Sequence, residues 1–150
     1  MNNKEQILSI FVDESGDSGD YNKNKNVFSD KFYIITFVFH EQKNDISPNI
    51  KYFENKLAQY DYYYQSVHCG PLIRREYPFE GFKAEDIRHI LNALNNFSRK
   101  LPINCYSVIV DKSINDDLQK LNKAIHNEVQ QMINDNYNYF HSFNKIIIYY

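Results

Sequence analysis

The chain has 150 residues, hydrophobic residues at 43% of its positions and a formal net charge of −2. This size and composition predict one globular domain with a hydrophobic core, and they exclude a disordered chain. The charge excludes a globally basic nucleic-acid binder, although it permits a local basic patch. Cys69 and Cys105 are too far apart in sequence for a zinc knuckle or a disulfide framework, so we expect reduced thiols.

No segment has the composition of a signal peptide or of a membrane span. The longest strongly apolar stretch, residues 32–39, is far shorter than the roughly 20 residues that cross a bilayer. We therefore expect a cytoplasmic protein that does not bind membranes.

Two strands and a helix are predicted in the first part of the chain. Residues 7–12 form a short apolar run rich in β-forming residues, and residues 32–39 form a longer one. The polar loop between them, residues 21–30, favours an antiparallel hairpin. A helix then begins, with Ser47 as its N-cap and Pro48 at its first position.

The middle of the chain combines irregular and helical patterns. Residues 62–68 are compatible with a short third strand. Residues 68–82 contain several Gly and Pro residues, which predict an irregular segment. The clearest helix covers residues 83–97, where apolar side chains recur on one face.

The last third of the chain alternates strand, helix and strand. The first strand covers residues 103–110, the helix about residues 115–134 and the final strand residues 145–150. This alternation is typical of parallel strands joined by right-handed helical crossovers. The predicted fold class is therefore α/β, with a mixed sheet in which an antiparallel N-terminal hairpin is followed by parallel strands. No domain boundary is evident.

The first candidate site follows the opening strand, where Asp13 and Glu14 begin a run of acids separated by Ser and Gly. A carboxylate at the end of a buried strand lies where open α/β sheets bind ligands. It suits Mg²⁺, which takes one or two carboxylates together with water and phosphate oxygens. The alternative is an acidic turn closed by side-chain hydrogen bonds. Asp17 and Asp20 are predicted to be turn and loop residues.

Asp111 is the second candidate, because it ends a strand in the same way as Asp13. If the two strands are parallel neighbours, both carboxylates lie at one edge of the sheet. They could then share metal ions, which lie roughly 3.5–4 Å apart in two-metal sites. Lys112 would contact phosphate. The alternative is that Asp111 starts the turn into the next helix and that Lys112 is a surface charge.

The third candidate is the segment from His68 to Glu76. Arg74 and Arg75 suit the bidentate recognition of phosphate. Glu76 would complete a carboxylate set at a metal, and His68 would act as a ligand or a proton shuttle. Each of these residues could equally be a solvated loop charge or a member of a salt-bridge network.

These segments together resemble a known family. Val12-Asp13-Glu14-Ser15-Gly16-Asp17-Ser18-Gly19, placed after a first strand, resembles the opening signature of the bacterial and phage family called domain of unknown function 3800. The segment of residues 68–76 and the strand that ends Val110-Asp111-Lys112 are similar to later blocks of that family. The similarity covers essentially the whole chain.

The resemblance implies a ribonuclease-H-like fold, in which acids at the ends of the first and fourth strands bind a divalent metal. It therefore implies a nuclease that depends on Mg²⁺ or Mn²⁺. Asp13 and, by its position, Asp111 would be ligands, and Glu14 belongs to the same signature. Nucleic acid, bound through a local basic patch, is the expected partner.

One departure from the family pattern concerns the end of the chain. Family members continue past the strand that corresponds to residues 145–150 into an Asp-containing turn and a later Gln-x-x-Asp motif, which this sequence lacks. We therefore expect residues 1–150 to be a single ribonuclease-H-like domain without its C-terminal part. The last strand would be left uncovered, which favours a homodimer. The alternative function is a non-catalytic module of the same fold that binds nucleic acid or protein.

Overall fold

The computed structural model describes residues 5–16, 30–63, 66–115 and 117–150, and the chain forms two compact units. Unit 1 comprises Met1–Asn44 and Ile103–Tyr150, and unit 2 comprises Asp45–Pro102. The sequence showed no boundary at either junction, because neither carries a Gly- or Ser-rich linker. Unit 2 is thus an insertion between two strands of unit 1.

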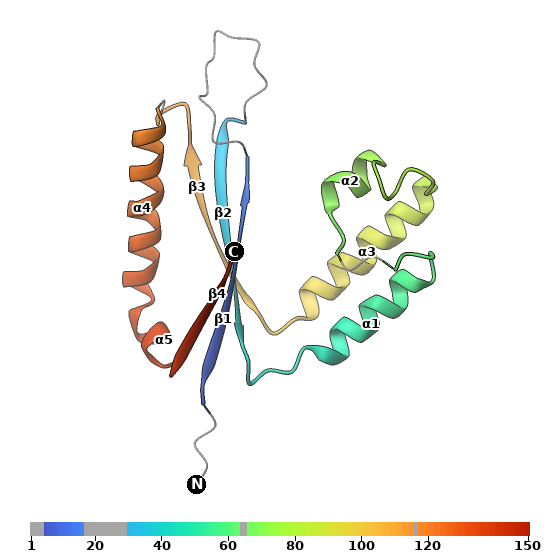
Figure 1. Ribbon diagram of the computed structural model, residues 1–150, viewed down its shortest axis with the longest axis horizontal. Coiled ribbons are helices and arrows are strands. Elements are labelled where there is room, and N and C mark those ends of the chain that lie inside the picture. The colour runs from blue at the N-terminus through green and yellow to red at the C-terminus, as the bar shows by residue number, and fades with distance from the viewer. Residues whose placement is uncertain (1–4, 17–29, 64–65, 116) are drawn as a thin grey trace. The chain divides into compact units, whose positions relative to one another are not determined.

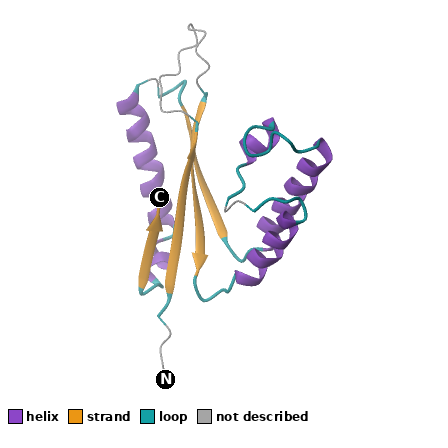
Figure 2. Ribbon diagram, turned by 45° about the vertical axis from the view of Figure 1, so that its right-hand side comes forward, coloured by secondary structure: helices purple, strands orange, loops and turns teal. Residues whose placement is uncertain are grey.

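Unit 1 is a mixed α/β unit whose described residues form a four-stranded sheet with helices on one face (Figures 1 and 2). β1 (Ile7–Ser15) pairs antiparallel with β2 (Phe32–Glu41), and β2 pairs antiparallel with β3 (Asn104–Asp111). β4 (Lys145–Tyr149) lies parallel beside β1, so the strand order is β3-β2-β1-β4. The predicted N-terminal hairpin and the helical crossover before the last strand are both confirmed.

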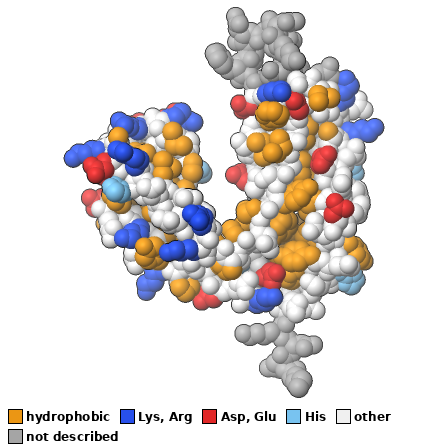
Figure 3. Space-filling model, turned by 180° about the vertical axis from the view of Figure 1, so that it is seen from behind, with side chains coloured by type: hydrophobic (Ala, Val, Ile, Leu, Met, Phe, Trp, Pro, Cys, Tyr) orange, Lys and Arg blue, Asp and Glu red, His pale blue; other side chains and the backbone are white. Residues whose placement is uncertain are grey.

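Two helices, α4 (Leu118–Asp135) and α5 (Tyr137–His141), pack on the sheet. Leu121 of α4 is buried against Val108 and Val110 of β3. Met132 is buried in a second cluster with Leu8, Ile10 and Phe39, which α5 completes. Apolar side chains also remain on the surface, and Figure 3 shows a band of them along unit 1.

The boundaries of these helices differ from the predicted ones for local reasons. α4 starts at Leu118 and not at Asn115, because Asp117 is its N-cap and accepts a hydrogen bond from the Lys120 N–H at 2.8 Å. α5 was not predicted, since five residues are too few to show a periodic pattern. Its Phe140 ring packs on Phe39 with the ring centroids 5.8 Å apart.

The described part of unit 2 contains three helices, α1 (Ser47–Ala58), α2 (Cys69–Arg74) and α3 (Ala84–Lys100). α1 and α3 match the predicted helices. The N-cap of α1 is Ile46, one residue before the predicted Ser47. The buried residues of the unit form one hydrophobic cluster: Leu57, Tyr62, Leu72, Phe79, Ile87 and Ile90.

The third strand predicted over residues 62–68 is wrong, because none of the described residues of that segment is in a strand. Tyr62 is buried there, and its ring stacks on Phe79 with the centroids 5.0 Å apart. The predicted irregular segment that follows contains α2. Pro71 fits there because it lies in the first helical turn, where a missing N–H breaks no intrahelical bond.

Asp17, Asp20 and most of the loop predicted over residues 21–30 lie outside the described residues. Within the described ranges, none of the helices combines the length and the apolar character that a membrane span requires.

Candidate functional site

Asp13 lies inside β1 and not beyond its end. The strand continues through Ser15, since Asp13 pairs with Thr36 and Glu14 pairs with Ile35 of β2. Successive residues of a strand point to opposite faces of the sheet. The side chains of Asp13 and Glu14 therefore lie on different faces, so the two carboxylates are not poised around one ion.

The face of Asp13 is the one that α4 does not cover. Asp13, Thr36 and Ser107 form one cross-strand row, and the hydroxyls of Thr36 and Ser107 are hydrogen-bonded at 2.9 Å. The next row contains Glu14 and Val108. Val108 is buried against α4, so this neighbouring row faces the helix and the row of Asp13 does not. The Asp13 side chain is exposed and, within the described part of the chain, makes no hydrogen bond or ion pair.

Glu14 has a partner from the end of the chain. The hydroxyl of Tyr150 donates a hydrogen bond to Glu14 Oε1 at 3.0 Å. This bond and the charge of Glu14 raise the pKa of the Tyr150 hydroxyl. Glu14 therefore helps to fasten the C-terminal residue beside β1.

Asp111 lies toward the same edge of the sheet as Asp13 but far from it. β1 and β3 both run antiparallel to β2, so they point the same way. However, β2 separates them, and Asp13 is level with Ser107, four residues before Asp111. With about 3.3 Å per residue and about 4.8 Å between strands, the two positions are on the order of 16 Å apart. They cannot share an ion or a pair of ions roughly 4 Å apart.

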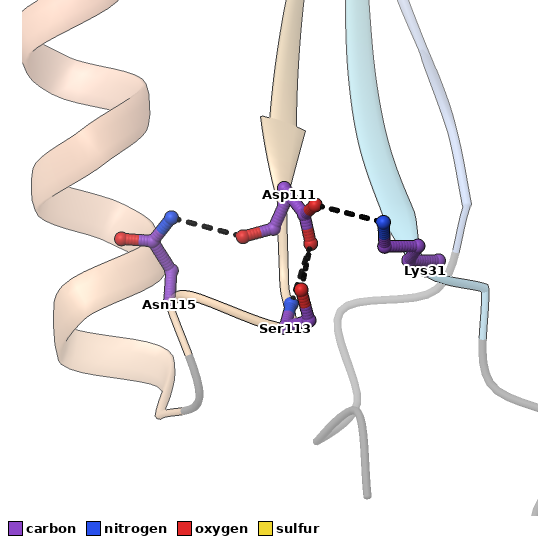
Figure 4. A network of polar contacts seen from close by, with 4 residues as sticks. All are labelled: Lys31, Asp111, Ser113 and Asn115. Carbon is purple, nitrogen blue, oxygen red and sulfur yellow. Dashed lines mark hydrogen bonds and ion pairs between the residues drawn. The ribbon is translucent and has the colours of Figure 1, made fainter. Parts of the chain in front are cut away.

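The Asp111 carboxylate is held by its own turn (Figure 4). One oxygen accepts hydrogen bonds from both the N–H and the hydroxyl of Ser113, and the other forms an ion pair with Lys31 at 3.1 Å. The Asp111 carbonyl accepts a bond from the side chain of Asn115 at 3.0 Å. The Ser113 hydroxyl is the largest cause that lowers the Asp111 pKa to about 2, and Lys31 adds to it. These contacts agree with the alternative interpretation, in which Asp111 starts the turn into the next helix.

The assignment of Asp111 to a fourth strand is also wrong. Because the described residues of 62–68 supply no strand, Asp111 ends the third of the described strands, and β4 is the fourth. β4 is parallel to β1, with Tyr149 opposite Phe11, and these two rings are stacked with centroids 4.8 Å apart. Tyr150 follows β4, so no described acid stands at the end of that strand.

Lys112 is neither a surface charge nor exposed to a phosphate in solution. The residue is only 1% exposed, and it contacts other parts of the chain. Its N–H donates a hydrogen bond to the Lys31 carbonyl at 2.9 Å. Lys112 directly follows Asp111, the last residue of β3.

The segment from His68 to Glu76 lies in unit 2, and two of its charged residues, Arg74 and Glu76, pair with each other. Arg74 donates two hydrogen bonds to the Glu76 carboxylate, at 2.7 and 2.8 Å. The pair raises the Arg74 pKa and lowers the Glu76 pKa. Arg75 ends α2 in a left-handed conformation with φ of 55°. Exposed His68 lies 3.2 Å from the Ser66 hydroxyl. Arg74 and Glu76 therefore agree with the alternative interpretation, in which these residues form a salt bridge.

Lys31 and Ser113 were not among the residues singled out from the sequence, although both hold Asp111. The Ser113 contact had a local signal, because Asp followed two residues later by Ser is typical of a side-chain-closed turn. The Lys31 contact had none, since it depends on the pairing of β2 with β3. Among the described residues, no three His, Cys, Asp or Glu side chains gather as a metal site.

Comparison with known proteins finds no match among family models, curated proteins or solved structures.

Proposed function

We propose that unit 1 is a ribonuclease-H-like domain that acts on phosphodiesters, with a divalent cation, Mg²⁺ or Mn²⁺, held at Asp13. The topology supports the fold part of this proposal. An antiparallel β1–β2 hairpin and a helical crossover that leads to β4, parallel beside β1, agree with the mixed sheet expected for that class.

The position of Asp13 carries the proposal. β1 lies between an antiparallel neighbour and a parallel one, and β1, β3 and β4 have their carboxyl ends at one edge of the sheet. Open α/β sheets bind ligands outside the carboxyl ends of their strands. Asp13 is an exposed carboxylate near that edge and has no hydrogen bond or ion pair to other described residues.

The described residues fit one ion and not two. Mg²⁺ is held in many proteins by one or two carboxylates, while water and substrate phosphate supply the other ligands. Asp13 meets this minimum, and Asp111 is too distant to join it. A bound cation would offset the negative charge of a phosphodiester. We therefore leave Asp111, Glu14 and Glu76 out of the proposed metal site.

Calorimetric titration with MgCl₂ and MnCl₂ tests the metal site. We expect the wild-type chain to release or absorb heat on binding, and Asp13→Asn to lose that signal. Asp135→Asn is the matched control, because Asp135 is an exposed carboxylate that ends α4. A wild-type titration without heat, or equal heats from wild type and Asp13→Asn, would contradict the proposal.

Cleavage assays test the activity itself. Single- and double-stranded DNA and RNA are incubated with Mg²⁺ or Mn²⁺, and Asp13→Asn is expected to lower the cleavage rate by roughly 10²-fold or more. Asp135→Asn should cleave like the wild type. Metal binding at Asp13 without cleavage of any of these substrates would remove the catalytic part of the proposal.

A non-catalytic interaction module is the second candidate function, and one feature of unit 1 favours it. A groove of about 280 Å³ between α4 and the sheet is lined only by apolar side chains, among them Val129, Ile133, Ile146 and Ile148. Ile148 is 66% exposed and Ile133 is 45% exposed. Exposed apolar surface of this kind often marks a protein contact.

A further inference from the structure

An exposed tyrosine lies beside two lysines on the surface of unit 2. Tyr52 belongs to α1 and is 54% exposed. The Nζ atom of Lys100, in the last turn of α3, is 5.6 Å from the centroid of the Tyr52 ring, and Nζ of Lys56 is 5.8 Å from it. Both distances are within the range of cation–π contacts. Figure 3 shows further Lys and Arg side chains over this unit.

A cavity of about 250 Å³ adjoins Tyr52 and has no acidic lining residue. Its walls combine amide, aromatic and cationic groups: Pro48, Asn49, Tyr52, Asn96, Phe97 and Lys100. The neighbouring acids are directed elsewhere. Asp45 accepts a hydrogen bond from the Ser47 N–H at 2.9 Å, and Glu54 lines a different cavity. Within the described residues, neither Lys56 nor Lys100 forms an ion pair.

Helix stability accounts for only part of this arrangement. A lysine in the last turn of a helix is favourable because it offsets the negative end of the helix dipole, and Lys56 and Lys100 both occupy such positions. This does not explain an exposed aromatic ring that attracts both cations, which repel each other. The core-facing aromatic residue of α1 is Phe53, which stacks on Phe97 with the centroids 4.7 Å apart. Tyr52 is therefore free of that packing role.

We propose that Tyr52, Lys56 and Lys100 form a binding site for single-stranded nucleic acid. A base stacks on the exposed ring of Tyr52, and the two ammonium groups contact the flanking phosphates. Asn49 and Asn96 supply amide groups that can hydrogen-bond to a base edge. A duplex fits less well, because its bases are stacked on one another and do not offer a free face.

Binding at this site needs neither Asp13 nor a metal, so the inference is independent of the metal site proposed in unit 1. The site also differs from the phosphate contacts expected from the sequence at Arg74, Arg75 and Lys112, of which Arg74 is already bound to Glu76 and Lys112 is buried.

Fluorescence anisotropy with a labelled oligothymidylate of about ten nucleotides tests the site, within the range that single-strand binding folds cover. The titrations contain EDTA, so that they report on this site independently of metal. Replacing Tyr52 by Leu should weaken binding at least about fivefold, the lower end of what one stacked base contributes. Lys56→Gln together with Lys100→Gln should reduce the slope of log K against log salt by about 1.4.

Matched variants keep the result interpretable. Lys123→Gln removes an exposed lysine from α4 in unit 1 and should bind like the wild type. Asp13→Asn should also bind like the wild type, so failure of the proposed metal site leaves this test intact. An abasic oligonucleotide of the same length should bind more weakly than oligothymidylate. Circular dichroism confirms that each variant is folded.

Three results would overturn the inference. The first is a wild-type chain that does not bind oligothymidylate at low salt. The second is a Tyr52→Leu or double-lysine variant that binds as tightly as Lys123→Gln. The third is equal affinity for the abasic and the thymidylate strands, since the site would then bind phosphate without stacking a base.

Discussion

Asp111 illustrates how a strand-end acid can be structural. Its pKa is lowered from 3.8 to about 2 in the folded chain, chiefly by the Ser113 hydroxyl. A group whose folded pKa is depressed stabilises the fold above its unfolded pKa, and that stability is lost as the pH falls through the folded value. The ionised Asp111 therefore stabilises unit 1 at neutral pH and stops doing so in acid.

Urea unfolding of wild type and Asp111→Asn at a series of pH values tests this. The wild type should be more stable from neutral pH down to about pH 4, and the difference should shrink as the pH approaches about 2. Asp135→Asn serves as the control and should show no such change. A difference between wild type and Asp111→Asn that stays constant over this range would contradict the role assigned to the turn.

Gly16 provides a second prediction at the scale of one residue. Its φ is +93°, and a Cβ added there would lie 2.5 Å from the Phe32 carbonyl oxygen. We expect Gly16→Ala to destabilise the chain by more than about 1 kcal/mol in thermal or urea unfolding. Gly81 has open space around the corresponding position, so Gly81→Ala should be neutral or stabilising by up to about 1 kcal/mol. Equal stabilities of the two variants would show that Gly16 is not constrained in this way.

At the scale of elements, α2 is short and contains Gly70 and Pro71, so tertiary packing must hold it in place. Leu72 is fully buried, whereas its neighbour Ile73 is 63% exposed. We expect Leu72→Ala to lower the free energy of unfolding by about 2–5 kcal/mol. Ile73→Ala should change it by less than about 0.5 kcal/mol. Similar losses from both variants would mean that α2 is not anchored through Leu72.

The long elements could be predicted from the sequence because their apolar residues recur with a clear period. α1, α3 and α4 have enough turns to show a face, and β2 is a continuous β-branched and aromatic run. α5 is too short for such a pattern, and α2 contains residues that usually break helices. The Tyr62 segment has β-forming residues, yet burial of Tyr62 against Phe79 determined its conformation.

For the candidate site, the sequence predicted which edge of the sheet the acids lie toward but not the distance between them. That Asp13 and Asp111 lie toward one edge of the sheet follows from the order of the elements. Their separation does not, because it depends on β2 lying between them and on a register that places Asp13 level with Ser107. The metal site and nuclease activity remain proposals that the experiments above address.

At the scale of the whole molecule, β4 is an edge strand with apolar side chains on both faces. Ile146, Ile148 and Tyr149 are 40%, 66% and 45% exposed. Among the described residues, no strand pairs with its outer edge. Two copies could pair through their β4 edges about a twofold axis, so that the same residues of β4 form the interface in both copies. This is the homodimer expected from the sequence.

Analytical ultracentrifugation over a range of concentrations tests this dimer. Ile148→Lys places a charge on this edge strand and should shift the chain to a monomer. Ile109→Lys is the matched control, since Ile109 is 61% exposed on β3, at the other edge of the sheet, and that variant should associate like the wild type. A wild-type chain that is monomeric at all concentrations would remove the dimer.

The register of β2 with β3 has a consequence for how the chain is made. Phe39 faces Asn104 across the pair, so the whole of Asp45–Pro102 stands where a hairpin would have a turn. During synthesis on the ribosome, β1 and β2 emerge first. β3 and β4 can pair with them only after this segment has been synthesised. Since unit 2 is continuous in sequence, it can fold during that interval. By becoming compact it would shorten the span over which β3 searches for β2, which lowers the entropic cost of completing the sheet.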